Sequence, residues 1–310
     1  MLIQKLNIHD EKIKSINVKN NILSSNSKNK IILYNLNRNM ISKIIYVDNK
    51  QYVELDDYIY SINNGNTISK TDTDSCRSTT YLGSRISYII TYNSEIYFGV
   101  EKGYIYLFKN DKIKQLISYL NFKLTCFYIV GLYTYIGYSN GSIGIFYNNK
   151  KQKMISPCGY YGSVISIKKY KNYIYYSCSK GAIKILCDNE YVETINLFSN
   201  NITMHTHNKG ILVYTNSSIS KIKDKYSKKI FQTTDNLCDF SYYNNLMFTS
   251  DGDSIKMYLI KLTKNNYNII PNNIKKYIFY VYNYCNNLLV GDLFFKIINL
   301  ICCITNVTHP

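Results

Sequence analysis

Short apolar stretches alternate with polar turns along the chain in one recurring order. In residues 94–108, three apolar residues, a small residue and a polar turn with glycine lead into an alternating apolar strand. Clear copies of this order occupy residues 133–146, 173–186 and 246–258, and weaker copies occupy residues 21–34, 58–71, 211–222 and 288–298. Alternation at period two, broken by turn residues, predicts a β-hairpin in each copy.

The copies recur at a nearly constant spacing. The first apolar residue after each turn is Ile31, Ile68, Ile105, Ile143, Ile183, Ile219, Ile255 or Phe295, at intervals of 36 to 40 residues. A further strand is expected before each hairpin, as at residues 124–130 and 277–282, and a more polar strand is expected after most of them, as at residues 40–47 and 113–120. Strands at this spacing indicate an all-β sandwich, barrel or propeller, and a four-strand period near 38 selects the propeller.

The repeating unit resembles a WD40 repeat over essentially the whole chain. The small residue that ends the second strand matches the family, at Ser25, Gly99, Gly137, Ser177, Thr249 and Gly291. The Trp-Asp signature is absent, and Tyr34, Phe108, Phe146, Leu186, Ile222, Tyr258 and Ile298 stand in the tryptophan place. The Gly-His pair that usually opens a unit survives at best as Ile8-His9. The resemblance therefore implies a propeller in which the family's interior hydrogen-bond chain is largely missing.

The resemblance also implies how the chain is organised. We expect residues 1–310 to form a single all-β, WD40-like β-propeller of seven to eight four-stranded blades, with eight favoured by the number of repeats. Family propellers close by pairing a strand from one terminus with the blade at the other, which removes exposed sheet edges. Residues 1–8 are the expected closing strand because no hairpin precedes them, and residues 300–307 compete for the same place.

The formal net charge of +17 implies attraction to polyanions such as nucleic acid, anionic membrane surfaces or acidic proteins. Nearly all of the positive charge is lysine, so contact with a phosphate backbone is more plausible than base recognition. In WD40 propellers the loops that join strands one to two and three to four share one face. That rule collects lysines on one face, and a solvated lysine-rich surface is the plainer alternative. The six candidate lysines of a basic binding face are Lys150, Lys151, Lys153, Lys225, Lys228 and Lys229.

Catalytic and metal-binding signatures are missing from the sequence. His205 and His207 would lie on one face of a strand and could bind a metal, but no third ligand accompanies them. The Asp251-Gly-Asp253 sequence is a fragment of a calcium loop, and a hairpin turn explains it better. No nucleophile motif or phosphate-binding glycine loop occurs. We expect no enzyme activity, no metal, no cofactor and no small-molecule substrate.

The nine cysteines include no C-x-x-C pair, and their odd number cannot form a complete disulfide framework, which favours a reducing compartment. Buried apolar roles are expected for Cys126, Cys178 and Cys238. The N-terminus has no secretory apolar region. The apolar run at residues 288–304 contains Asp292 and Lys296 and is too short for a membrane span. An intracellular location follows, with the nucleus or nucleolus favoured over the cytoplasm.

Two functional hypotheses follow from these observations. The first is a non-catalytic propeller scaffold that binds other proteins in a multi-subunit assembly, with a ribosome-biogenesis or other RNA–protein particle as its context and possible RNA contact through the basic face. The second is a cytoplasmic or coat-associated adaptor that binds a peptide and contacts no nucleic acid. Under the second hypothesis the positive charge has no part in binding.

Overall fold

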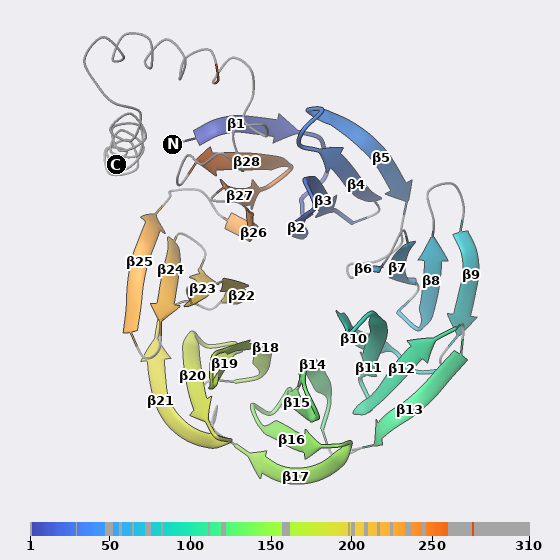
Figure 1. The fold of residues 1–310 in the computed structure, drawn as a ribbon, viewed down its shortest axis with the longest axis vertical. Helices are drawn as coiled ribbons and strands as arrows, with labels where there is room; N and C mark the ends of the chain where they lie inside the picture. The colour runs from blue at the N-terminus through green and yellow to red at the C-terminus, as the bar shows by residue number, and fades with distance from the viewer. Residues whose placement is uncertain are drawn as a thin grey trace. The chain divides into compact units, whose positions relative to one another are not determined.

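The computed structural model contains seven four-stranded antiparallel sheets among the residues it describes (Figure 1). It describes residues 2–259, apart from short gaps, and Lys275. The gaps are residues 29, 47–51, 56–57, 64, 72–75, 82, 111, 119–121, 157–161, 198, 200–201, 208–209, 216–217, 224–225, 233–236 and 244–245. The chain forms two compact units, one of Met1–Tyr46 with Thr234–Pro310 and the other of Val47–Thr233.

The unit of Val47–Thr233 contains five sheets, and in each of them the strands follow one another in chain order. Their strands are β6 (Tyr52–Leu55), β7 (Tyr58–Asn63), β8 (Thr67–Thr71) and β9 (Cys76–Tyr81); β10 (Ile86–Tyr92), β11 (Glu95–Val100), β12 (Tyr104–Lys109) and β13 (Lys112–Ser118); β14 (Leu124–Val130), β15 (Tyr133–Tyr138), β16 (Ile143–Tyr147) and β17 (Lys150–Ile155); β18 (Val164–Tyr170), β19 (Tyr173–Cys178), β20 (Ala182–Cys187) and β21 (Glu190–Asn196); β22 (Thr203–His207), β23 (Gly210–Tyr214), β24 (Ser218–Lys223) and β25 (Tyr226–Gln232).

The other unit contains two sheets, one in chain order and one that joins both parts of the unit. The first sheet is β2 (Ser15–Lys19), β3 (Ile22–Asn26), β4 (Lys30–Asn35) and β5 (Met40–Tyr46). The second has the order β1 (Leu2–Asn7), β28 (Ser254–Leu259), β27 (Leu246–Asp251) and β26 (Leu237–Tyr243).

The repeat anchors found in the sequence are among the most deeply buried positions of these sheets. All seven isoleucine anchors begin or nearly begin the third strand of a sheet, and each is at most 1% exposed: Ile31, Ile68, Ile105, Ile143, Ile183, Ile219 and Ile255. The strand boundaries also agree with the sequence to within a few residues, and β14 matches the expected residues 124–130 at both ends. The sequence periodicity therefore reports burial in the core of each sheet.

The small residue that ends the second strand is required by packing between neighbouring sheets. A Cβ atom added at Gly137 would lie 2.6 Å from Cγ1 of Val164, on the next sheet, and 2.8 Å from Sγ of Cys126. A Cβ atom at Gly99 would likewise lie 2.8 Å from Cδ2 of Leu124. The first strand of one sheet thus packs directly on the backbone of the sheet before it, and only a very small side chain leaves room.

Asparagine-rich turns join the strands at one end of several sheets. Both central residues of the Asn20-Asn21, Asn93-Ser94, Asn148-Asn149 and Asp188-Asn189 turns have positive φ angles, between 47° and 64°. Two-residue hairpins of this kind require the left-handed conformation, which asparagine and aspartate tolerate better than most residues. Asparagine, which is abundant in the chain, therefore serves to form these tight turns.

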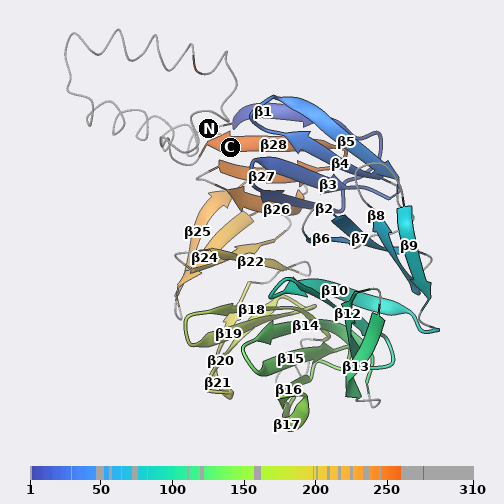
Figure 2. The same cartoon turned by 45° about the vertical axis from the view of Figure 1, so that its right-hand side comes forward.

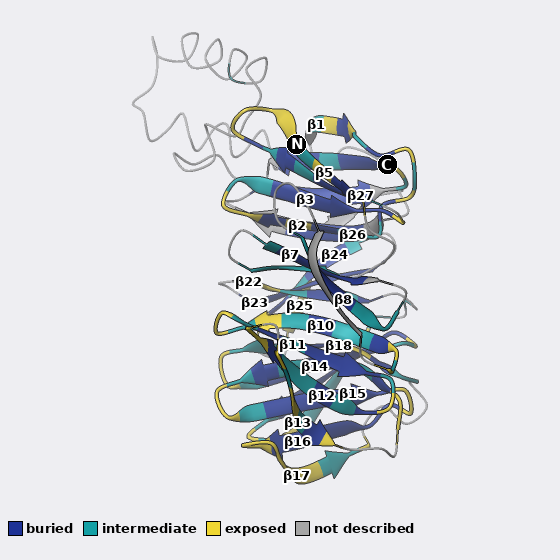
Figure 3. Cartoon of the chain, turned by 90° about the vertical axis from the view of Figure 1, so that its right-hand side faces the viewer, coloured by how far each residue is buried: buried dark blue, intermediate teal, exposed yellow. Residues whose placement is uncertain are grey.

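The apolar cores lie between neighbouring sheets. One cluster joins the sheets β14–β17 and β18–β21, and it includes Tyr135, Ile143, Val164 and Tyr176. Comparable clusters join β6–β9 to β10–β13, β10–β13 to β14–β17, and β18–β21 to β22–β25. Exposed positions concentrate in the turns and on the last strand of a sheet, as at β17 (Figure 3).

In the sheet β26–β28, the N-terminal strand supplies the fourth strand. Strand β1 pairs antiparallel with β28, with Leu6 opposite Ile255 (Figure 2). Within the same unit, the sheets β26–β28 and β2–β5 are joined by backbone donors, because the amide of Ile16 donates to Asp239 Oδ2 over 2.9 Å and the amide of Val18 to Ser241 Oγ over 3.1 Å. Residues from the two ends of the described chain therefore form one hydrogen-bonded body.

Seven sheets are observed where eight were favoured. The edge of β28 is occupied by β1, so a further strand from the C-terminal repeat cannot pair there. The eighth anchor, Phe295, and the competing closing strand at residues 300–307 lie outside the described residues, as do the strands expected at residues 277–282 and 288–298.

A buried histidine forms a hydrogen bond with the small residue that ends β3. His9 follows β1, is 7% exposed, and its Nε2 lies 2.8 Å from Oγ of Ser25, the small residue that ends β3. Burial, reinforced by the positive charge of Lys30, lowers the pKa of His9 to about 4. The imidazole is therefore neutral at neutral pH.

Candidate binding surface

Five of the six candidate lysines lie on two outer strands instead of on loops. Lys150, Lys151 and Lys153 lie on β17, and Lys228 and Lys229 lie on β25; all five are exposed. Lys225 lies outside the described residues. These lysines belong to strands because the preceding turn is short: Asn148-Asn149 occupies the whole turn before β17, so the strand begins already at Lys150.

The structure does not bring the two lysine groups together on adjacent strands. The sheet β18–β21 follows the β17 sheet in the chain and packs on it, and the β25 sheet packs on the other side of β18–β21. The intervening outer strand, β21, carries Glu190 and Glu193, and Lys153 forms an ion pair with Glu190. An acidic strand thus separates the basic ones.

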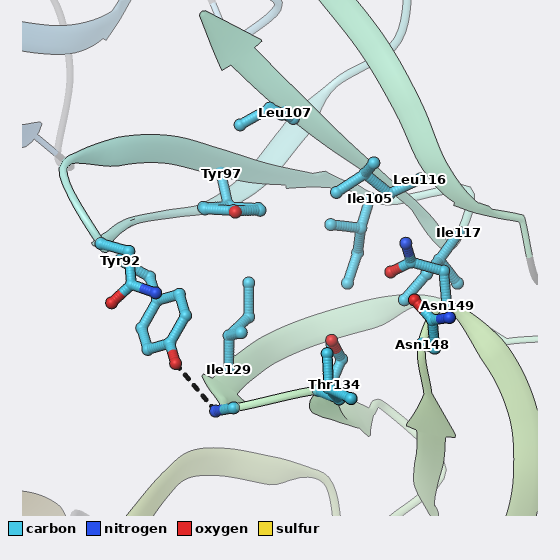
Figure 4. Close-up of a pocket in the computed structure, with 13 residues that line it drawn as sticks. Tyr92, Tyr97, Ile105, Leu107, Leu116, Ile117, Ile129, Thr134, Asn148 and Asn149 are labelled. Atoms are coloured by element: carbon cyan, nitrogen blue, oxygen red, sulfur yellow. Dashed lines mark hydrogen bonds between the residues drawn. The ribbon is translucent and has the colours of Figure 1, made fainter.

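A cavity of about 260 Å³ lies between the sheets β10–β13 and β14–β17 (Figure 4). Its apolar wall comes from Ile105 and Leu107 on β12, from Leu116 and Ile117 on β13, and from Ile129 on β14. The two sheets already share an apolar cluster, and the cavity continues this cluster to the surface. The pocket is therefore built by the same packing that joins the sheets.

Three turns form the rim of the pocket. They contribute Asn93, Gly131-Leu132 and Asn148-Asn149. Backbone hydrogen bonds fix these turns, since the amide of Asn148 donates to the carbonyl of Leu132 over 2.9 Å and the amide of Gly131 donates to Tyr92 Oη over 2.8 Å (Figure 4). The rim is thus held in place across both sheets, while the three asparagine carboxamides lie on exposed residues beside the opening.

Tyr97 also lines the pocket, and its hydroxyl already forms a hydrogen bond within the protein. It donates to Glu95 Oε2 over 2.8 Å, and Glu95 pairs with Lys109 over 2.6 Å. Burial, together with this carboxylate, raises the pKa of Tyr97 to about 12. The hydrogen bond from Lys109 lowers the pKa of the Glu95 carboxyl. Tyr97 is neutral at physiological pH and serves as a fixed wall.

The pocket is suited to binding an uncharged group. The described residues that line it include no carboxylate, ammonium, imidazole or thiol, and their hydroxyls belong to Tyr92, Tyr97 and Thr134. An apolar wall with a few polar groups at the opening is typical of a site that accepts an apolar side chain and orients it through hydrogen bonds at the rim. The repeat pattern in the sequence does not indicate this site, because its walls come from two different repeats.

The other candidate chemistry falls into structural roles where it is described. His205 and His207 lie on β22, and Asp251 ends β27, so that Gly252-Asp253 forms the turn to β28, with Gly252 at a φ of 60°. The described residues contain no group of three histidine, cysteine, aspartate or glutamate side chains that could hold a metal ion. In the same residues no helix is long and apolar enough to cross a membrane, and residues 288–304 lie outside them.

The cysteines are partly as expected. Cys126 is a fully buried free thiol, and burial raises its pKa to about 12. Cys178 is also fully buried in an apolar cluster, as expected, and it is disulfide-bonded to a cysteine outside the described side chains. The side chain of Cys238 lies outside the described residues.

No protein-family model and no curated protein matches the chain. Solved structures do match in fold. The WD40 β-propeller domain of Doa1 aligns over 83% of this chain and 95% of its own, with a TM-score of 0.66 and 10% identity. The β-propeller domain of Cps50 (Swd1) from Myceliophteria thermophila aligns over 84% and 99%, with a TM-score of 0.67 and 8% identity. The computationally designed Ika8 protein aligns over 84% and 99%, with a TM-score of 0.62 and 10% identity.

The fold is a seven-bladed, WD40-like β-propeller. This confirms the all-β class and the resemblance drawn from the repeat, and it sets the number of blades at seven. Each four-stranded sheet described above is one blade, and the pocket lies between the blades β10–β13 and β14–β17. At identities of 8 to 10% the likeness concerns the fold alone.

Proposed function

We propose that this propeller is a non-catalytic scaffold that binds other proteins, and that the pocket between the blades β10–β13 and β14–β17 receives an apolar side chain of a partner. The observation that carries the proposal is the combination of an uncharged apolar wall with three exposed asparagines at the rim. A site of this composition can bury one side chain and hold the adjoining peptide backbone. It offers no pair of groups arranged for nucleophilic or acid–base catalysis.

The partner segment is an extended peptide with one anchoring residue. A cavity of about 260 Å³ accommodates a single leucine, isoleucine, methionine or phenylalanine side chain. The carboxamides of Asn93, Asn148 and Asn149 each carry donors and an acceptor, so they can bond both the amides and the carbonyls of a backbone. Burying one large apolar side chain contributes about 2 to 3 kcal/mol before the cost of ordering the peptide. Affinity from this pocket alone is therefore modest, as in adaptors that use several weak contacts.

This proposal favours the peptide-binding adaptor over an RNA–protein particle. The observation behind the RNA hypothesis is the net charge of +17 together with the exposed lysines of β17 and β25. The described lysines lie on strands separated by the acidic strand β21, and this separation favours a binding surface other than a single basic face. The ribosome-biogenesis context and the nuclear location stay predictions. Affinity purification before and after nuclease treatment tests them, because partners held through RNA would be lost.

A selection from a random peptide phage library on the immobilised full-length protein tests the pocket. Selected peptides should share one large apolar residue within an otherwise variable extended sequence. In the variant Leu116→Lys, a charge enters the apolar wall, and affinity for these peptides should fall at least about tenfold, since an unpaired ammonium cannot be buried beside the ligand. Thermal melting of the variant separates lost binding from lost folding.

A second variant removes two of the three asparagine carboxamides at the rim without disturbing the turns. The double substitution Asn93→Gly and Asn149→Gly keeps positive φ angles of 48° and 64° accessible, because glycine adopts them freely. Affinity should fall several-fold. The matched control is Asn110→Gly, at a φ of 50° in the turn between β12 and β13 and not among the described lining residues, which should bind as wild type. Equal binding by wild type and Leu116→Lys would contradict the proposal. Selection of acidic peptides whose affinity falls only when the six candidate lysines are replaced would favour the basic surface as the binding site.

A further inference from the structure

Strand β5, the outer strand of the first blade, exposes an unusual amount of apolar surface. Met40 is 53% exposed, Ile41 38%, Ile44 43% and Tyr46 80%. These four side chains lie within seven consecutive residues, and one edge of the strand pairs with β4 while the other has no strand beside it in the sheet order. A long apolar edge strand invites pairing with another segment, so proteins rarely leave one uncovered.

Four other outer strands carry several charged residues. Strand β17 presents Lys150, Lys151 and Lys153, and strand β13 presents Lys112 and Lys114. Strand β21 presents glutamates, and β25 presents Lys228 and Lys229. Lysine on a sheet edge is a common means of preventing unwanted strand pairing. Strand β5 contains a single charged residue, Lys43, and so differs from the others in the property that keeps an edge in water.

The sequence contains an apolar segment outside the described residues. Residues 288–304 are apolar except for Asp292, Lys296 and a few small or polar residues, and β1 already occupies the edge of β28 that a following strand would use. The segment follows β28, which belongs to the same compact unit as β5. As a flexible coil, residues 260–287 would reach on the order of 30 Å, and packed sheets are about 10 Å apart, so the distance between neighbouring blades is within range.

We propose that residues 288–304 cover the outer surface of β5 in the same molecule. Two observations point to this pairing. Strand β5 exposes apolar side chains and has few charges, and β1 already occupies the edge of β28 with which the apolar segment could otherwise pair. Because the two are linked covalently, the association is intramolecular and does not depend on protein concentration. A second copy of the chain is the competing occupant, and its association would depend on concentration.

Hydroxyl-radical footprinting of the full-length protein tests the proposal with an internal control. Tyr46 and Tyr226 are 80% and 82% exposed on two outer strands, so they should react alike if nothing covers β5. With residues 288–304 seated on β5, Tyr46 and Met40 should be labelled at least about threefold more slowly than expected from Tyr226. In the full-length variant Leu293→Glu with Ile297→Glu, two charges oppose this seating. Labelling of Tyr46 should then rise to the level of Tyr226.

Two results would overturn the proposal. Equal labelling of Tyr46 and Tyr226 in the wild type would show that β5 is open and would overturn it. Protection that is unchanged in the double-glutamate variant and weakens on dilution, with a dimer mass by light scattering, would assign the surface to a second copy and overturn it as well. A variant control, Ser118→Glu on β13, should leave both rates unchanged, and melting curves show whether each variant remains folded.

Discussion

The stability of the protein should depend on pH through His9. The folded-state pKa of about 4 lies below the ordinary value of 6.5, so between these two values the unfolded chain binds a proton that the folded chain refuses. The slope of unfolding free energy with pH has the sign of protons bound in the unfolded state minus protons bound in the folded state. Stability is therefore complete above pH 6.5 and falls as pH decreases from 6.5 to 4.

The magnitude follows from the shift and from the surroundings of the ring. A displacement from 6.5 to about 4 corresponds to about 3 kcal/mol, at 1.36 kcal/mol per pKa unit. The ring is 7% exposed, but the exposed ion pair between Asp10 and Lys30 brings solvent close to it, so screening reduces the effect to about 2 kcal/mol. Among the described residues Nδ1 has no hydrogen-bond partner, so a second proton would find no acceptor there.

Urea unfolding of wild type and His9→Gln between pH 4 and 8 measures this contribution. Glutamine can donate to Ser25 but does not titrate, so the difference in unfolding free energy should be constant above pH 7 and should shrink by about 2 kcal/mol by pH 4. Other titrating groups affect both proteins alike and cancel in the difference. Parallel pH profiles for the two proteins would refute the depressed pKa. So would a His9 proton resonance that titrates near 6.5.

Three further predictions concern packing and charge. Leu6→Ala on β1 removes a side chain that is 6% exposed and should lower the free energy of unfolding by about 2 kcal/mol in denaturant melts, whereas Lys5→Ala should change it by less than about 0.5 kcal/mol. Gly137→Ala should cost about 1 to 3 kcal/mol, because Val164 lies within 2.6 Å of the added Cβ, and Gly83→Asn, with open space and a φ of 64°, should cost under about 1 kcal/mol. Replacing the six candidate lysines by glutamate should leave the melting temperature nearly unchanged and should not alter peptide binding to the pocket. A loss of peptide binding comparable to that of Leu116→Lys would contradict the separation of the two surfaces.

The sequence predicted the blades well because burial in a propeller is periodic. Each third strand buries its first isoleucine, and the neighbouring blade packs closely on the small residue before the turn at Gly99 and Gly137, so both positions recur at the repeat spacing. The number of blades was less certain, because the pattern at Phe295 is the same kind of pattern. What decided it was the pairing of β1 with β28, a contact between distant parts of the chain that no local pattern reports.

The candidate site was beyond the reach of the sequence for a related reason. A repeat pattern shows which residues are equivalent in different blades, but Leu116 and Ile129 form one pocket by facing each other across two blades. The lysines were misplaced on loops since the length of a turn depends on the left-handed residues within it. Asn148 and Asn149 complete the turn in two residues, and the basic residues that follow belong to the strand.

The interior and the surface of this propeller are under different physical constraints, and this difference indicates where specificity resides. The anchor that begins the third strand is a buried isoleucine in all seven blades, because dense packing admits few side chains there. The outer strands share the same geometry but differ in chemistry: β17 and β25 are basic, β21 is acidic and β5 is apolar. Differences that packing does not require are the ones available for binding. Because the pocket and β5 lie in different compact units, Leu116→Lys and the double-glutamate variant probe independent surfaces, and the failure of either experiment leaves the other informative.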